Sequence, residues 1–128
     1  MMKLLLATNN AGKLEEMQVL LRSESVELLV PRDLGISLDV AETGSSYLEN
    51  ATLKARAFAQ ASGLLALADD SGLEVDALGG KPGLYSARFA PQEGANDADR
   101  RAYLVEQLLS FPQPWQARFV SVIVLAKP

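Results

Sequence analysis

The spacing of apolar residues predicts a strand, a helix and a second strand at the start of the chain. Residues 2–8 form a nearly continuous apolar run, which is typical of a buried strand. Over residues 11–22 the apolar positions recur every three or four residues and share one helix face, and residues 26–30 are apolar again. We therefore expect a β-α-β unit.

Signals for helix ends predict a longer helix in the middle of the chain. Residues 31–43 have the composition of a loop with an acidic stretch. The sequence Ser46-Tyr47-Leu48-Glu49 is a capping box, in which a serine and a glutamate three residues apart satisfy backbone N–H groups at a helix start. The helix is expected to run to about Ala61, because Gly63 is a typical C-terminal stop.

Two short apolar runs follow this helix, separated by a polar sequence. Residues 64–68 and 73–78 predict strands, and Asp69-Asp70-Ser71-Gly72 lies between them. We therefore expect one strand to end at the aspartates and another to begin after them. The next run, Gly79-Gly80-Lys81-Pro82-Gly83, has the composition of a tight turn, because glycine and proline supply unusual backbone angles.

The last quarter of the sequence predicts a helix and a strand. Asn96 or Asp97 can cap a helix that reaches about Leu109, and residues 118–127 form a final apolar strand. The alternation of strands and helices favours an α/β fold with a central mixed β-sheet flanked by helices. Because no linker, repeat or low-complexity tract interrupts the sequence, we expect a single domain over residues 1–128.

Composition excludes several kinds of chemistry. The 128 residues include no cysteine and no histidine, so disulfides, zinc sites of these residues and catalysis by either residue are excluded. A net charge of −4 argues against a broad basic surface for long nucleic acid. The apolar start is too short for a membrane span or a signal peptide, so we expect a cytoplasmic protein. Any catalysis must use carboxylates, lysines, hydroxyls and a bound metal.

The first predicted strand leads into Thr8-Asn9-Asn10-Ala11-Gly12-Lys13, where the chain turns into a helix. Such a turn brings together backbone N–H groups, a hydroxyl, an amide and an ammonium group, which suit a phosphate. It is not a P-loop, because Ala7 and Leu14 stand where that motif needs glycine and serine or threonine. The alternative is an ordinary helix start, in which Asn10 caps the helix and Lys13 is solvated.

Asp69 and Asp70 form a second candidate group. They follow a buried strand, which would carry both carboxylates to the same edge of the sheet as Thr8. Mg²⁺ commonly takes one or two carboxylates together with substrate phosphates, so this pair is sufficient for a magnesium site. The alternative is an aspartate-rich turn without a ligand.

The third candidate group lies around the start of the middle helix. Asn50 and Lys54 are four residues apart and share a helix face, so an amide and an ammonium group can reach one site. Glu42 precedes the helix in a loop, which suits a metal ligand. Glu49 is explained by its place in the capping box, and Lys54 has a solvated position as its alternative.

Five ordered segments carry a family resemblance. They are Thr8-Asn9-Asn10-Ala11-Gly12-Lys13, Glu42-Thr43-Gly44, Glu49-Asn50-Ala51-Thr52-Leu53-Lys54-Ala55, Ala68-Asp69-Asp70-Ser71-Gly72-Leu73 and Leu78-Gly79-Gly80-Lys81-Pro82-Gly83-Leu84-Tyr85-Ser86-Ala87-Arg88. Together they resemble the Ham1-type inosine triphosphate pyrophosphatases. The resemblance implies Mg²⁺-dependent hydrolysis of deaminated purine nucleotides such as ITP, dITP and XTP to the monophosphate and pyrophosphate, which cleanses the nucleotide pool.

The resemblance also implies a role for each matching residue. The residues implied to hold the triphosphate are Thr8, Asn9, Asn10, Ala11, Gly12, Lys13 and Lys54. Asp70 is implied as the general base with a role at the metal, and Ser71 as a substrate contact. Asp69 and Glu42 are implied as further carboxylates at the metal. Many relatives have two acids before Thr-Gly where this chain has Ala41-Glu42, so the metal ligands stay open among the three carboxylates.

The resemblance has a departure at the C-terminal end. Relatives continue through two further blocks that contact the purine base, and this sequence has neither, so we expect a Ham1-like domain that is incomplete at its C-terminus. Residues 119–125 are apolar with strong β propensity and would expose an unpaired sheet edge. We therefore expect self-association, with a homodimer as the family's common state. The alternative function is a catalytically poor fragment that binds phosphate or nucleotide.

Overall fold

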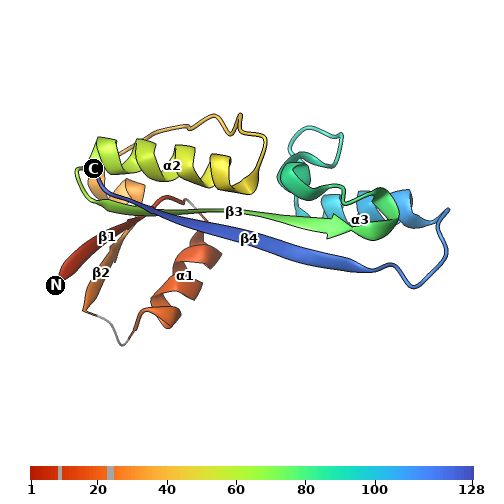
Figure 1. Cartoon of the computed structure of the whole chain (residues 1–128), viewed down its shortest axis with the longest axis horizontal. Helices are drawn as coiled ribbons and strands as arrows, with labels where there is room; N and C mark the ends of the chain where they lie inside the picture. Colours follow the sequence, from red (N-terminus) through yellow and green to blue (C-terminus); the bar gives the residue numbers. More distant parts are fainter. Residues whose placement is uncertain (9, 23–24) are drawn as a thin grey trace. The chain divides into compact units, whose positions relative to one another are not determined.

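The computed structural model confirms the predicted β-α-β start. It describes residues 1–8, 10–22 and 25–128. The first elements are β1 (Met2–Leu6), α1 (Ala11–Leu20) and β2 (Val26–Leu29), followed by a 3₁₀ turn at Pro31–Leu34 (Figure 1). Among the described residues, no helix combines the length and the apolar character needed to cross a membrane.

Two compact units divide the chain. One comprises Met1–Asp70 with Val122–Pro128, and the other comprises Ser71–Ser121. The strands β3 (Leu65–Val75) and β4 (Ala117–Ala126) contribute residues to both. The expectation of a single domain over residues 1–128 stays a prediction.

The sheet is mixed and has the strand order β2-β1-β3-β4. β1 runs parallel to both of its neighbours, and Leu4 lies beside Leu28 of β2 and Leu65 of β3. β4 runs antiparallel to β3, because Ser71 bonds to Ser121 while Glu74, further along β3, bonds to Arg118, earlier in β4. The predicted fold class, an α/β fold with a mixed sheet flanked by helices, is confirmed.

Helices cover the two faces of the sheet in the first unit. α1 and α2 (Tyr47–Ser62) lie on opposite sides of it (Figure 1). The core under α2 consists of Leu5, Ala7, Ala55, Phe58, Ala59, Ala66 and Ala68. The core on the α1 side consists of Leu4, Leu6 and Leu67, with Leu14, Met17 and Leu21 packed against them. The chain leaves β1 for α1 on one face of the sheet and enters β3 after α2 on the other face. The ends of the neighbouring strands β1 and β3 therefore form a topological switch point, where α/β sheets commonly bind ligands.

The middle helix has the ends that the sequence predicts. Ser46 is the N-cap of α2, and its hydroxyl accepts a hydrogen bond from the backbone N–H of Glu49 at 3.1 Å. Gly63 ends the helix with a left-handed φ of 71°. Glu49 accepts from the backbone N–H and the hydroxyl of Ser45, so its carboxylate serves the helix start.

The predicted strand break at Asp69-Asp70-Ser71-Gly72 is wrong. β3 is continuous from Leu65 to Val75, and residues 76–78 form a 3₁₀ turn instead of a strand. β1 pairs with β3 only as far as Leu67, so the aspartates lie beyond the end of β1, as the sequence analysis anticipated. The strand continues there because β4 supplies its neighbour. Hence the two aspartates belong to a strand, and successive side chains point to opposite faces of it.

The second unit contains the predicted glycine turn and the third helix. Three glycines of the turn, at positions 79, 80 and 83, have positive φ. α3 (Asp97–Leu108) is capped by Asn96, whose side-chain oxygen accepts from the backbone N–H of Asp99 at 2.8 Å. The predicted tight turn and helix start are therefore confirmed.

Candidate functional site

The turn after β1 is organised by two polar side chains. Asn10 is the N-cap of α1, because its Oδ1 accepts from the backbone N–H groups of Gly12 at 2.9 Å and Lys13 at 3.3 Å. The backbone N–H of Asn10 donates to the Thr8 hydroxyl at 3.1 Å. Asn9 lies outside the described residues. The capping part of the simpler alternative is thus correct, and it positions Lys13 in the first turn of α1.

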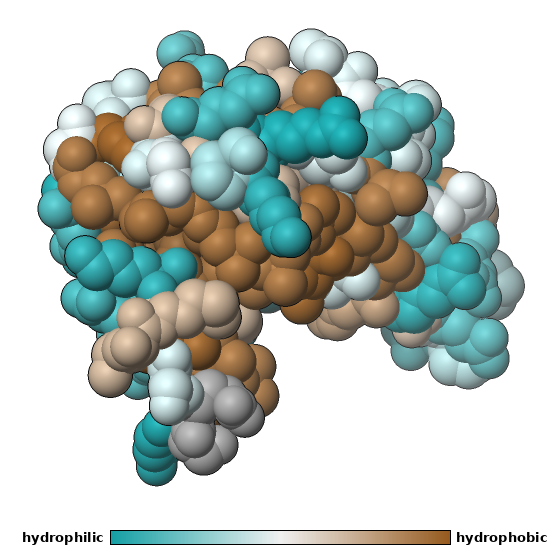
Figure 2. Space-filling model, turned by 60° about the vertical axis from the view of Figure 1, so that its left-hand side comes forward, coloured by the Kyte–Doolittle hydropathy of each residue, from teal (hydrophilic) through white to brown (hydrophobic). Residues whose placement is uncertain are grey.

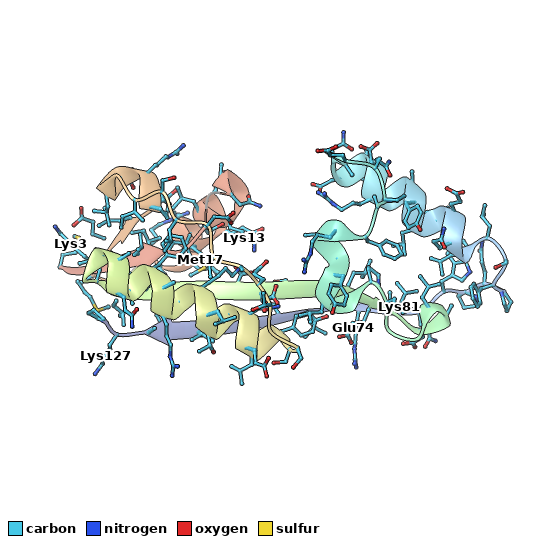
Figure 3. All side chains as sticks on the ribbon, turned by 90° about the horizontal axis from the view of Figure 1, so that it is seen from above. Lys3, Lys13, Met17, Glu74, Lys81 and Lys127 are labelled. Carbon is cyan, nitrogen blue, oxygen red and sulfur yellow. The ribbon has the colours of Figure 1, made fainter. Side chains whose placement is uncertain are left out.

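Lys13 forms an ion pair across the face of the sheet that carries α1. Its Nζ lies 2.9 Å from both carboxylate oxygens of Asp69. The side chains are 38% and 19% exposed, respectively, so the pair is partly shielded from water. Figure 3 labels Lys13 on α1, one turn before Met17. The other part of the simpler alternative, a solvated Lys13, is therefore wrong, and a charged contact ties the turn to β3.

A second set of polar contacts lies on the face that carries α2. The Asn50 amide donates to Asp70 Oδ2 at 3.2 Å, and Asn50 Oδ1 accepts from the backbone N–H of Gly44 at 2.8 Å. One helical turn later, Lys54 Nζ lies 2.8 Å from Glu42 Oε1. The predicted sharing of one helix face by Asn50 and Lys54 is consistent with these contacts, since both reach the loop at residues 42–44.

The structure separates the two aspartates that the sequence left equivalent. Asp69 contacts Lys13 of α1, whereas Asp70 contacts Asn50 of α2, because adjacent strand residues alternate between faces. Within residues 1–8, 10–22 and 25–128, no three acidic side chains gather into a group that could hold a metal ion. A metal at this edge would take one or two carboxylates and complete its coordination with water or phosphate, as Mg²⁺ commonly does.

Two other polar residues, Ser71 and Arg32, have contacts apart from these two sets. The Ser71 hydroxyl donates to the Ser121 hydroxyl at 3.1 Å within the second unit. Arg32 lines a small hollow with Thr8, Asn10, Ala11, Leu14 and Val30. Sequence analysis missed Arg32 because it treated residues 31–43 as an irregular loop. The available sequence signal was Pro31, because proline is common at the first position of a helical turn, and the 3₁₀ turn that begins there presents this arginine.

Comparisons with known proteins agree on one family. The model of the Ham1 family matches residues 4–128. A dITP/XTP pyrophosphatase of Haemophilus influenzae is 51% identical over 123 residues, which are 95% of this chain and 62% of that protein. A dITP/XTP pyrophosphatase of Thermus thermophilus is 48% identical over 128 residues and is matched over 60% of its length. The chain thus spans about three fifths of the length of these curated relatives.

Solved structures give the same result. A HAM1 protein from Coxiella burnetii superposes with a TM-score of 0.88 at 41% identity, over 99% of this chain and 64% of that one. The Ham1 protein of Staphylococcus aureus gives a TM-score of 0.83 at 39% identity, over 98% of this chain and 64% of that one. On the strength of the family match and of these relatives, the chain belongs to the Ham1 family.

Proposed function

We propose that this chain carries the triphosphate end of a Mg²⁺-dependent nucleoside triphosphate pyrophosphatase that hydrolyses dITP, XTP and ITP. The relatives named dITP/XTP pyrophosphatase support the substrate class. The observation that carries the proposal is a pair of lysines, each beside a carboxylate: Lys13 contacts Asp69 just beyond the end of β1, and Lys54 of α2 contacts Glu42.

In this proposal the two lysines and the start of α1 bind phosphate oxygens. The positive end of the helix dipole and an ammonium group favour an anion, and they stabilise the charge that builds up during phosphoryl transfer. Asn10 holds the first turn of α1 in shape, since it caps two of the backbone N–H groups. Asn9, Ala11 and Gly12 belong to the same proposed phosphate segment, and Ser71 is kept as a proposed substrate contact.

The carboxylates fit a magnesium ion by their chemistry. Oxygen donors are what Mg²⁺ prefers, and the contacts to α2 place Glu42 and Asp70 on the same side of the sheet. These two would hold the ion, and Asp69 stays a proposed further carboxylate near the metal. When bound, the ion would neutralise charge on the phosphates.

Asp70 is the proposed general base. Its carboxylate would orient the attacking water and take its proton, while Lys13 and Lys54 hold the phosphates. No histidine is needed, in keeping with a chain that has none. The proposed site is therefore complete in the residue types that attack on a phosphorus atom requires.

Pyrophosphate release tests this function. The chain is incubated with ITP, XTP, ATP or GTP and Mg²⁺, and compared with Asp70→Asn and with Asp39→Asn, which removes the same charge from an exposed loop residue. We expect turnover of ITP and XTP that Asp70→Asn abolishes and Asp39→Asn retains. Wild-type turnover no greater than that of Asp70→Asn would refute the proposed enzymatic activity. The alternative, a catalytically poor fragment that binds phosphate or nucleotide, would then remain. Equal rates on ITP and ATP would refute base selectivity.

Two further properties belong to the proposal. We place the protein in the cytoplasm, where its nucleotide substrates are, and we propose that it self-associates as a homodimer. Support for self-association comes from β4, an edge strand on which Ile123 and Leu125, both in the first unit, are 59% and 57% exposed. Figure 2 shows a broad hydrophobic area on one face of the molecule. An exposed apolar edge strand favours pairing with another chain.

A further inference from the structure

Asn50 is buried in an unusual way for an amide. Only 2% of Asn50 is exposed, and among the residues that the structure describes no other polar or charged residue is buried. Burying an amide without hydrogen-bond partners costs free energy, so a buried asparagine usually has partners for both its carbonyl oxygen and its amide nitrogen. Here both are used, by Gly44 on one side and by Asp70 on the other.

The orientation of the Asn50 amide follows from its partners. The Gly44 backbone N–H can only donate, so the oxygen of the amide must face it at 2.8 Å. The nitrogen then faces Asp70 Oδ2 at 3.2 Å and donates to it. A flipped amide would lose both contacts, so the direction of the hydrogen bond to Asp70 is fixed by the loop at residues 42–44.

Gly44 permits this close approach. A Cβ at this position would lie 2.6 Å from Glu49 Cβ and 2.7 Å from Asn50 Oδ1, both too short for a real side chain. The lack of a side chain at residue 44 therefore lets the loop sit directly on the amide. The same loop carries Glu42, whose carboxylate pairs with Lys54.

We propose that Asn50 is a positioning residue for Asp70. The amide fixes the orientation of the Asp70 carboxylate and links it to the loop that carries Glu42. The carboxylates of the proposed base and of the proposed metal ligand are thereby held in fixed positions relative to each other. This inference rests on the proposed function, because positioning matters for catalysis only if Asp70 acts on the substrate. Orientation of a reacting group is worth about a hundredfold in rate when a displacement of about 1 Å is avoided.

The test compares two substitutions of Asn50 with a matched control. Asn50→Asp keeps the shape and the acceptor for Gly44 but loses the donor to Asp70, and Asn50→Ala loses both contacts. Gln60→Glu makes the same amide-to-carboxylate change at an exposed position of α2. Pyrophosphate release, KM and the melting temperature are measured for each, with rates taken well below every melting transition.

We expect both Asn50 variants to lower kcat by about tenfold or more while KM changes by less than about twofold. Gln60→Glu should match the wild type. A kcat equal to that of the wild type in a folded Asn50→Asp or Asn50→Ala protein would overturn the inference while the proposed function stands. If one variant does not fold, the other decides. A wild type without turnover would overturn the proposed function, and the inference with it.

Discussion

Replacing Asp69 by asparagine should strengthen the binding of metal-free triphosphate, although the replaced residue lies in the proposed site. In the structure both oxygens of Asp69 hold the Lys13 ammonium at 2.9 Å. A phosphate that binds Lys13 must break this ion pair and then lies close to the carboxylate it displaced. Asparagine is nearly the same size but has no charge, so Lys13 is available to the anion and the repulsion is removed.

The size of the gain follows from the exposure of the pair. Lys13 is 38% and Asp69 19% exposed, so the cost of breaking the pair lies between that of an exposed pair, up to about 1 kcal/mol, and the larger cost of leaving one charge of a buried pair uncompensated. Taking about 1 kcal/mol after screening by water, the dissociation constant should fall about fivefold. High salt should reduce the gain, because screening weakens partly exposed ion pairs.

Titration calorimetry with inorganic tripolyphosphate, with a chelator and no Mg²⁺, measures this effect. Glu16→Gln is the matched control, because it removes the same charge from an exposed position of α1 one turn from Lys13. In a Lys13→Met background only the relief of repulsion between residue 69 and the anion remains, so the Asp69→Asn change should give a smaller gain there than in the wild-type background. Unchanged or weaker binding by Asp69→Asn, or a gain no larger than that of Glu16→Gln, would show that Asp69 does not compete with phosphate for Lys13.

Three further predictions concern stability and assembly. Gly63→Ala should lower the free energy of unfolding by about 1 kcal/mol in urea titration, because Gly63 has a φ of 71° that alanine adopts only with strain. The Arg100 guanidinium lowers the pKa of Asp97 below its usual 3.8, so stability from this pair is present above that pH and is lost on acidification; Asp97→Asn should flatten the pH dependence of melting below about pH 4. Ile123→Lys should make the protein monomeric in light scattering at micromolar concentration, where the wild type should be larger; a monomeric wild type would contradict self-association through β4.

The sequence predicts the helices well because their ends are decided locally. Ser46, Gly63 and Asn96 act on neighbours within four residues, and each is found at the helix end that it was expected to mark. The prediction of a strand break at residues 69–72 was wrong because the structure there is decided by a distant part of the chain. Whether Asp69 and Asp70 form a turn or continue a strand depends on β4, whose Ser121 lies 50 residues from its partner Ser71.

The candidate site shows the same division between local and distant information. Spacing along a helix placed Asn50 and Lys54 on one face, and order along the chain placed the aspartates beyond the end of β1. The contact between Lys13 and Asp69 joins residues 56 apart and needs the parallel pairing of β1 with β3 to bring them together. A continuous β3 then sends the two aspartates to opposite faces, which a turn would not have done.

The paired charges have a consequence for how the proposed ligands bind. Each lysine proposed for phosphate lies beside a carboxylate proposed for the metal, so the site without ligands has little charge of its own to attract either one. Phosphate bound alone would leave two carboxylates facing it, and a metal bound alone would leave two ammonium groups facing it. Bound together, each ligand takes the partners that the other releases. Each should therefore raise the affinity for the other by the same factor, because coupling between two binding sites is reciprocal.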